Sequence, residues 1–276
     1  MNENHPIGVF DSGVGGLTVV SEIMKQLPYE NIVYFGDTAR VPYGEKTPHE
    51  INVFVKEIVD FLIKFKVKAI VMACNTSSAI AYPVIKDEYK TPMFEMINPA
   101  VEEARRVTRN KKIGVIANSA TINSNVYKNK LEAANNCKAF QQACPLLVPL
   151  VERGERGTDY TKKILHTYLD PLLAEEVDTL ILGCTHYPHL LNEIKEIVGE
   201  EVFVLNPAKK VVEKIKEYFS KNNLLKNEPR YIHKYFVSGD VEQFKFAAQA
   251  LFPGETFSNI EHVQLIKESN KIQESC

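Results

Sequence analysis

Two cysteines in this chain follow short apolar runs and precede hydrogen-bonding side chains. Cys74 ends the run in KAIVMACNTSSA, and Cys184 ends the run in DTLILGCTHYPHL. Because open parallel sheets bind ligands beyond the carboxyl ends of their strands, a thiol at such a place can meet a substrate. Each cysteine also precedes a predicted helix start, where the pKa of a thiol is lowered. One such cysteine could be an inert buried thiol, but the matched pair favours a chemical role.

Polar side chains near the two thiols could transfer protons or bind a ligand. His186 lies two residues after Cys184 and could act as an acid or base beside it. Glu152, in the segment VERGERG, could orient His186. Asp11 and Ser12 follow the first predicted strand in FDSGVGGLT, where glycines permit a close backbone approach and the next helix N-terminus favours an anion. The pattern is neither a complete dinucleotide fingerprint nor a P-loop, so it favours a small carboxylate ligand, with a plain tight turn as the alternative.

Two opposed thiols suit the inversion of a carbon centre. If two similar halves pack face to face, their strand-end cysteines lie on opposite sides of one cleft. One thiolate then removes a proton from a substrate carbon, and the opposite thiol delivers one. A thiol-disulfide enzyme usually has its cysteines close together as C-x-x-C. The alternatives are a thiol hydrolase or lyase that uses only Cys184 and His186, and a non-catalytic amino-acid-binding module.

The elements that must position these residues alternate between β-rich runs and helical patterns. The clearest helix is predicted over residues 48–64, where apolar residues recur at helical spacing. Strands are predicted at 7–10, 31–35, 69–73, 92–97, 112–116, 179–182, 202–205 and 231–237. Continuous apolar strands between helices indicate an α/β fold with a mainly parallel sheet covered on both faces.

Similar segments recur in the same order in two parts of the chain. IGVFDSGVGG begins at Ile7 and IGVIANSATI begins at Ile113. Each is followed, at a similar separation, by one of the two strand-end cysteines. This repetition predicts a duplicated α/β unit.

The composition excludes several classes of protein. The 276 residues are 45% hydrophobic and 25% charged, which allows one large or two medium domains. A net charge of −2 creates no general attraction for nucleic acid or an anionic membrane. No signal peptide or membrane-spanning run is evident, so we expect a cytoplasmic protein.

The five cysteines lack C-x-x-C spacing, which argues against a disulfide framework or a structural zinc site. Cys137 and Cys144 are expected to be structural, and Cys276 belongs to the polar tail.

Four motifs, FDSGVGGLTV, VPYG, ACNTSSA and GCTHYP, resemble in this order the cofactor-independent glutamate racemases of the aspartate/glutamate racemase superfamily. The resemblance implies interconversion of L- and D-glutamate without cofactor or metal, supplying D-glutamate for peptidoglycan. It implies two pseudo-symmetric α/β domains, 1–97 plus 208–276 and an inserted 98–207, with the active site in the cleft between them. A homodimer is compatible with it, although no segment marks an interface. Racemisation of another amino acid, such as aspartate, remains an alternative.

The resemblance also implies roles for individual residues. Cys184 would deprotonate L-glutamate and Cys74 would deprotonate D-glutamate. Asp11 would assist Cys74, and His186, with Glu152 as its partner, would assist Cys184. The positions that match substrate contacts are Asp11, Ser12, Tyr43, Gly44, Asn75, Thr76, Thr121, Thr185 and His186. Two positions depart from the pattern, since Asn118 stands where many relatives have Thr and Asn125 where many have Gly; we expect these to affect binding details rather than chemistry.

Overall fold

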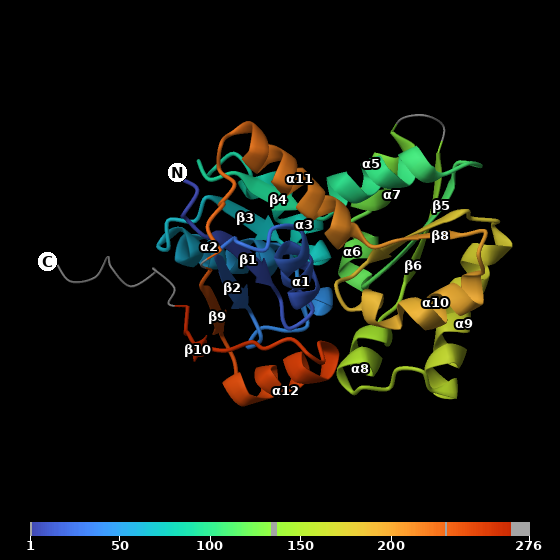
Figure 1. Ribbon diagram of the computed structural model, residues 1–276. Coiled ribbons are helices and arrows are strands. Elements are labelled where there is room, and N and C mark those ends of the chain that lie inside the picture. Colours follow the sequence, from blue (N-terminus) through green and yellow to red (C-terminus); the bar gives the residue numbers. More distant parts are fainter. Residues whose placement is uncertain (1, 134–136, 230, 266–276) are drawn as a thin grey trace, which may run out of the picture.

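The computed structural model describes residues 2–133, 137–229 and 231–265, so the predicted tail with Cys276 lies outside the described residues. The described chain forms two parallel sheets flanked by helices (Figure 1). The first sheet has the strand order β10-β9-β2-β1-β3-β4, and the second has the order β6-β5-β7-β8. Among the described residues, no helix combines the length and apolar character needed to cross a membrane.

The two sheets repeat one topology. The first contains β1 (Ile7–Asp11), β2 (Ile32–Gly36), β3 (Ala69–Met72), β4 (Met93–Glu95), β9 (His233–Val237) and β10 (Ile260–His262). The second contains β5 (Lys112–Ala117), β6 (Lys138–Ala143), β7 (Thr179–Gly183) and β8 (Phe203–Leu205). The order β2-β1-β3-β4 in the first corresponds to β6-β5-β7-β8 in the second, and all of these pairings are parallel. The predicted duplication of an α/β unit is therefore confirmed.

Helices connect the strands and cover both sheets. They are α1 (Leu17–Gln26), α2 (Pro48–Ile63), α3 (Asn75–Ile80), α4 (Tyr82–Ile85), α5 (Ile97–Val107), α6 (Ser119–Asn123), α7 (Val126–Glu132), α8 (Leu147–Glu152), α9 (Asp159–Ala174), α10 (Leu191–Val198), α11 (Pro207–Lys221) and α12 (Val241–Leu251), with short 3₁₀ turns η1 (Tyr43–Glu45) and η2 (Tyr187–Leu190). A capping box of Thr47 and Glu50 starts α2, with Pro48 at its first position. The predicted helix at 48–64 is thus confirmed to within one residue.

Several predicted boundaries differ from the structure. Strands β6 and β10 are absent from the sequence-based prediction. They lie at the sheet edges, where polar residues face solvent and the apolar pattern is weak. The strand expected at 92–97 ends at Glu95, because α5 begins two residues later. The carboxylate of Glu95 accepts hydrogen bonds from the first N–H groups of that helix, those of Ile97 and Asn98. Asn125 precedes α7 with φ 54°, a left-handed conformation that Asn tolerates, so it can occupy a position where Gly is common.

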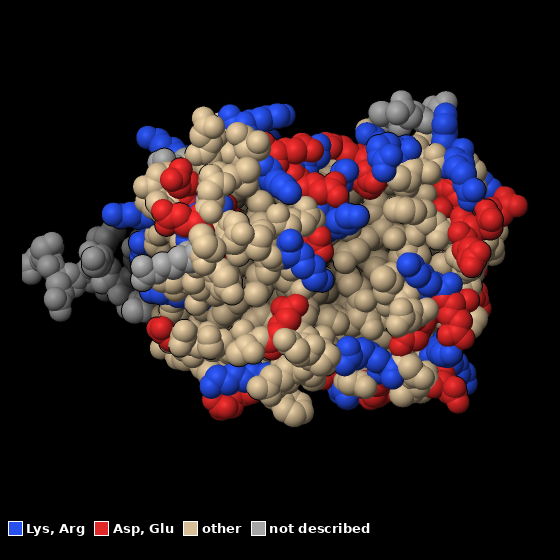
Figure 2. All heavy atoms as spheres, viewed as in Figure 1, with Lys and Arg blue, Asp and Glu red and all other residues tan. Residues whose placement is uncertain are grey.

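The two sheets share a continuous apolar core. One cluster contains Val9 and Val71 from the first sheet, Leu182 from the second, and Val211 from α11. Helix α11 packs against both α1 and α5, and it returns the chain from the second sheet to the first (Figure 1). On the molecular surface in Figure 2, acidic and basic side chains occur over both halves, in keeping with the small net charge.

A buried ion pair ties this returning chain to the first sheet. Lys68, just before β3, is fully buried, and its Nζ lies 2.5 Å from Oε2 of Glu30. The same Nζ donates hydrogen bonds of 2.7 Å to the carbonyl oxygens of Glu3 and Leu224. Because Leu224 follows α11, one cation joins three separate chain segments at the end of the sheet opposite the strand-end thiols.

Replacing this cation should destabilise the fold strongly. We expect Lys68→Met to lower the free energy of unfolding by about 3–5 kcal/mol, because Glu30 loses its buried counter-charge and two carbonyl groups lose their donor. Denaturant unfolding of the purified protein measures this change. The matched control is Lys56→Met, whose ion pair with Glu88 is solvent-exposed and should contribute less than about 1 kcal/mol. Equal, small effects of both substitutions would contradict the role of Lys68.

Candidate active site

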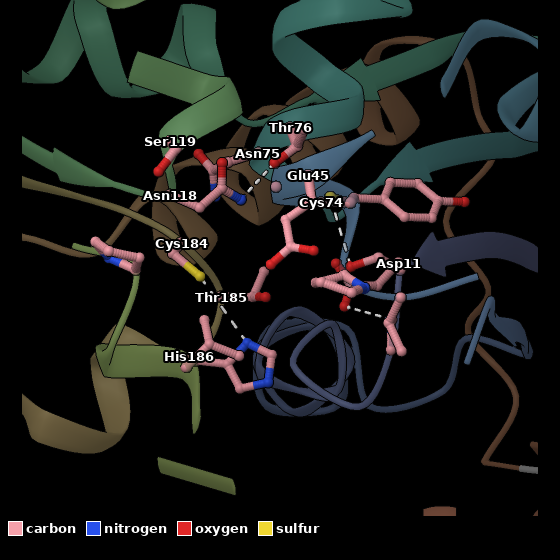
Figure 3. A pocket seen from close by; sticks show the side chains of 18 of the residues that line it. Asp11, Glu45, Cys74, Asn75, Thr76, Asn118, Ser119, Cys184, Thr185 and His186 are labelled. Carbon is pink, nitrogen blue, oxygen red and sulfur yellow. Dashed lines mark hydrogen bonds between the residues drawn. The ribbon is translucent and has the colours of Figure 1, made fainter. Parts of the chain in front are cut away.

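A single cavity of about 450 Å³ brings together the strand ends of both sheets. Cavities of this size hold small-molecule ligands. It is lined by all but one of the predicted site residues, namely Asp11, Ser12, Tyr43, Gly44, Cys74, Asn75, Thr76, Glu152, Cys184, Thr185 and His186. In Figure 3, Cys74 and Asp11 lie on one side of this pocket, and Cys184 and His186 lie on the other.

Cys74 is the residue immediately before α3, and its thiol is buried at the pocket wall. The sulfur accepts a hydrogen bond of 3.5 Å from the backbone N–H of Ser77 and lies 3.9 Å from Oγ of Ser12. Burial, and after it the nearby charge of Asp11, raise the pKa of this thiol to about 11. The expected lowering of its pKa by the helix N-terminus is therefore wrong, because desolvation and the carboxylate outweigh the single N–H bond. At neutral pH Cys74 is a protonated thiol.

Asp11 ends β1 and presents one free carboxylate oxygen. Its Oδ2 accepts hydrogen bonds from the backbone N–H groups of Gly13 at 3.1 Å and Gly16 at 3.0 Å. Its Oδ1 is buried and has no partner among the described residues. Burial raises the pKa of Asp11, although the charge of His186 acts in the opposite direction. The free oxygen can accept a hydrogen bond from a ligand donor such as an ammonium group.

Cys184, His186 and Glu152 form a chain of contacts on the opposite wall. Nδ1 of His186 lies 3.9 Å from the sulfur of Cys184, and its Nε2 lies 3.0 Å from Oε1 of Glu152. Glu152 is the last residue of α8 rather than part of a loop, and a 3₁₀ turn rather than an α-helix follows His186. Burial by itself lowers the pKa of His186, but the hydrogen bonds to Cys184 and Glu152 outweigh it and raise the pKa to about 10. The imidazole is therefore positively charged at neutral pH.

The hydroxyl of Thr76 connects the pocket to the second sheet. It accepts a hydrogen bond of 2.6 Å from Nδ2 of Asn118 and lies 3.0 Å from Oγ1 of Thr121. Oδ1 of Asn118 in turn accepts the backbone N–H of Thr121 at the start of α6, at 2.9 Å. Thr121 itself is fully buried and does not line the pocket, so the structure places it one layer behind Thr76. Asn118, noted above as a departure from the family pattern, both lines the cavity and holds Thr76.

The loop after β2 forms another wall of the pocket. Tyr43 is buried, and its hydroxyl donates a hydrogen bond to Oδ2 of Asp37, which also pairs with Arg40. These contacts anchor the loop so that Gly44 and Glu45 reach the cavity. The hydroxyl of Tyr43 is thus used within the protein.

Sequence reasoning missed several lining residues, among them Glu45, Ser119 and Cys144. Cys144 was expected to be merely structural, yet it is buried at the cavity wall. Burial, and then the proximity of Cys184, raise the pKa of its thiol, so it stays protonated. It follows β6 directly, and recognition of that edge strand would have placed this third thiol at a strand end as well.

The pocket has no lysine or arginine in its lining. Its carboxylates are those of Asp11, Glu45 and Glu152, and its cationic group is the imidazole of His186. Anionic groups of a ligand must therefore be bound mainly by neutral donors, such as backbone N–H groups, hydroxyls and amides. Within the described ranges, no group of three or more His, Cys, Asp or Glu side chains could hold a metal ion.

A close backbone contact joins the two walls. Oγ1 of Thr18, in α1, donates a hydrogen bond of 2.9 Å to the carbonyl oxygen of Thr185. A Cβ atom added to Gly15 would come within 2.4 Å of Oγ1 of Thr185 and 2.6 Å of the ring of His186. Only glycine permits this approach, since no side chain fits in that space.

The charge of His186 can be tested by titration. We expect NMR of labelled histidines to show His186 protonated through neutral pH, and Glu152→Gln to lower its pKa, because one of the two hydrogen bonds that raise it is lost. Because the pKa of His186 is higher in the folded state than its usual 6.5, its protonation stabilises the fold. This stabilisation is complete below pH 6.5 and is lost as the pH rises through about 10. The stability difference between wild type and Glu152→Gln should therefore shrink as the pH is raised over this interval.

His189 provides the internal control for that titration. Burial, followed by the charge of His186, lowers its pKa to about 4, so it should stay neutral at pH 7 in both proteins. A wild-type His186 that titrates near 6.5 would contradict the assigned charge.

The chain is similar in sequence and in structure to known proteins. Residues 7–215 match the family of Asp/Glu/Hydantoin racemases. A glutamate racemase of Thermoanaerobacter pseudethanolicus is 42% identical over 266 residues, which cover 96% of this chain and 99% of that protein. The crystal structure of a glutamate racemase isoform from Bacillus anthracis superimposes with a TM-score of 0.91 at 38% identity, covering 96% of this chain and 99% of that one. The structure of a glutamate racemase from Francisella tularensis in complex with D-glutamate has a TM-score of 0.89 at 34% identity, covering 95% of this chain and 98% of that one.

Proposed function

The chain belongs to the Asp/Glu/Hydantoin racemase family, and we propose that it is a glutamate racemase that interconverts L- and D-glutamate with two cysteines and no cofactor. The observation that carries this proposal is the presence of Cys74 and Cys184 on opposite walls of one small cavity. Each thiol has its own ionisable neighbour, Asp11 on one side and His186 on the other. A hydrolase or lyase would need only one of these two arrangements.

The charges of the free site favour L-glutamate as the substrate of the resting form. Cys74 keeps its proton, because burial and Asp11 raise the pKa of its thiol to about 11. On the other wall, the charged imidazole of His186 lies 3.9 Å from the sulfur of Cys184, and the proposed step uses Cys184 as the thiolate. Cys184 then takes the Cα proton of L-glutamate, and Cys74 delivers its own proton to the opposite face of the same carbon.

The proton balance of this step is closed. The C–H bond to Cα breaks on one face, its electron pair stays on carbon, and a new C–H bond forms on the other face. The enzyme is left with a protonated Cys184 and a deprotonated Cys74, which is the form that accepts D-glutamate for the reverse reaction. Exchange of protons with water restores the original form.

Neutral donors and Asp11 account for the binding of the substrate. The unpartnered Oδ1 of Asp11 suits the substrate ammonium, whose positive charge makes the Cα proton more acidic. The hydroxyls of Ser12 and Thr185 and the amide of Asn75 suit the two carboxylates. His186 adds the one positive charge on the wall that carries Cys184.

We further propose the cellular and structural setting that the resemblance implies. The D-glutamate would supply peptidoglycan synthesis in the cytoplasm, with no nucleic acid or membrane partner, and the protein would form a homodimer. The two sheets support a division into residues 1–97 plus 208–276 and an inserted 98–207, because β1–β4, β9 and β10 make up one sheet and β5–β8 the other.

Hydrogen exchange at Cα tests the reaction itself. We expect the protein, incubated with L-glutamate in heavy water without added cofactor, to form D-glutamate that carries deuterium at Cα, followed by NMR and chiral chromatography. The deuterium comes from Cys74, whose proton equilibrates with the solvent. Folded protein that yields neither exchange nor D-isomer would overturn the proposal. Aspartate under the same conditions measures the selectivity.

Substitution of each thiol tests the two-base mechanism. We expect Cys74→Ala and Cys184→Ala each to lower racemisation by at least about 10²-fold, because each removes one proton-transfer group. Cys137→Ala is the matched control, since Cys137 is also buried but does not line the cavity, and it should retain activity. Full activity in either active-site variant is incompatible with the mechanism.

A further inference from the structure

Tyr127 makes a buried hydrogen bond between the two halves of the molecule. It lies on α7, beside the second sheet, and is fully buried. Its hydroxyl donates a hydrogen bond of 2.8 Å to Oδ1 of Asn75, the first residue of α3 beside the first sheet. Tyr127 itself does not line the cavity, whereas Asn75 does. The phenol therefore reaches the site only through the amide of Asn75.

The amide of Asn75 has one satisfied end and one free end. Its Oδ1 is used by Tyr127, while its Nδ2 is buried and has no partner among the described residues. A buried donor without a partner costs about 1–3 kcal/mol. A ligand that places an acceptor against Nδ2 recovers this energy, and the acceptors of an amino acid are its carboxylate oxygens.

The hydrogen bond with the phenol leaves the nitrogen end of the amide free for a ligand. Burial raises the pKa of Tyr127 well above its usual value, and the nearby charge of Glu95 acts in the same direction, so the hydroxyl keeps its proton. A protonated hydroxyl that donates to Oδ1 leaves both hydrogens of Nδ2 for the ligand. With the amide turned by a half-rotation, its oxygen would face a substrate carboxylate, which repels it.

The ring of the same tyrosine also lies near the strand that leads to the other thiol. A Cβ atom added to Gly183, the last residue of β7, would lie 3.4 Å from the ring of Tyr127. Gly183 directly precedes Cys184, and Asn75 directly follows Cys74. Tyr127 thus bonds to the residue that follows one thiol and lies near the residue that precedes the other.

We propose that Tyr127 is a positioning residue for substrate recognition: it holds the amide of Asn75 so that Nδ2 donates to a carboxylate oxygen of the amino-acid substrate. This inference rests on the proposed racemase function. The contact with a carboxylate exists in the bound substrate and in the transition state alike, so its loss weakens binding and leaves the chemical step nearly unchanged.

The test is Tyr127→Phe, which removes the hydroxyl and keeps the ring. The KM for both L- and D-glutamate should rise about tenfold, while kcat changes by less than about threefold, the size expected for one lost hydrogen bond. The thermal stabilisation of the protein by added glutamate should fall in parallel. The matched control is Tyr235→Phe, a buried tyrosine whose hydroxyl has no partner among the described residues, and its KM should stay within about twofold of wild type.

A double-substitution cycle separates positioning from a general structural effect. Asn75→Ala should raise KM at least as much as Tyr127→Phe, and Tyr127→Phe should add nothing in the Asn75→Ala background. Additive effects, or an unchanged KM in Tyr127→Phe, would overturn the inference. If Tyr127→Phe does not fold, Asn75→Asp is measured instead, because it keeps an acceptor for the phenol but loses the donor to the substrate. We expect the KM of this variant to rise. An unchanged KM would also overturn the inference.

Wild-type protein is measured alongside every variant. A wild type that does not racemise glutamate would refute the proposed function, and with it this inference. An active wild type with an unaltered Tyr127→Phe would refute the role of Tyr127 alone.

Discussion

The approach of Gly15 to Thr185 and His186 determines how near the two walls of the cavity can come. No side chain fits at position 15, and the hydrogen bond from Thr18 to the carbonyl oxygen of Thr185 holds the same contact from α1. The contact lies between the walls that carry the two strand-end thiols, since Gly15 follows β1 and Thr185 directly follows Cys184. The glycine-rich turn after β1, which suggests anion binding in the sequence, thus also packs against the second half of the molecule.

The two thiols occupy similar places in their sheets but different electrostatic surroundings. Cys74 lies next to a buried carboxylate and keeps its proton, whereas Cys184 lies next to a protonated imidazole that Glu152 holds in place. The repeated unit therefore carries a protonated thiol beside a carboxylate in one half and a thiol beside a charged imidazole in the other. The proposed two-base reaction depends on this difference in surroundings.

Recognition of an anionic ligand in a cavity without lysine or arginine depends on the placement of neutral donors. Their strength comes from burial and orientation, since a fixed donor in a low-dielectric site does not need to reorganise. Contacts that cross between the halves provide this orientation: Asn118 holds Thr76, and Tyr127 holds Asn75. The separation of the two halves and the geometry of the donors are consequently coupled.

Local apolar runs and the polar residues that end them suffice to predict the α/β class, the repeated unit and the two strand-end thiols. Edge strand β6 was not predicted, because its alternating pattern is weak. The place of Cys144 at the end of that strand was therefore not predicted either. Three other features become visible only in the folded chain: the raised pKa of Cys74, the position of Thr121 behind Thr76, and the contact of Tyr127 with Asn75. Burial and contacts between residues distant in the chain set these properties, and no local pattern encodes which side chains will meet when the two sheets pack.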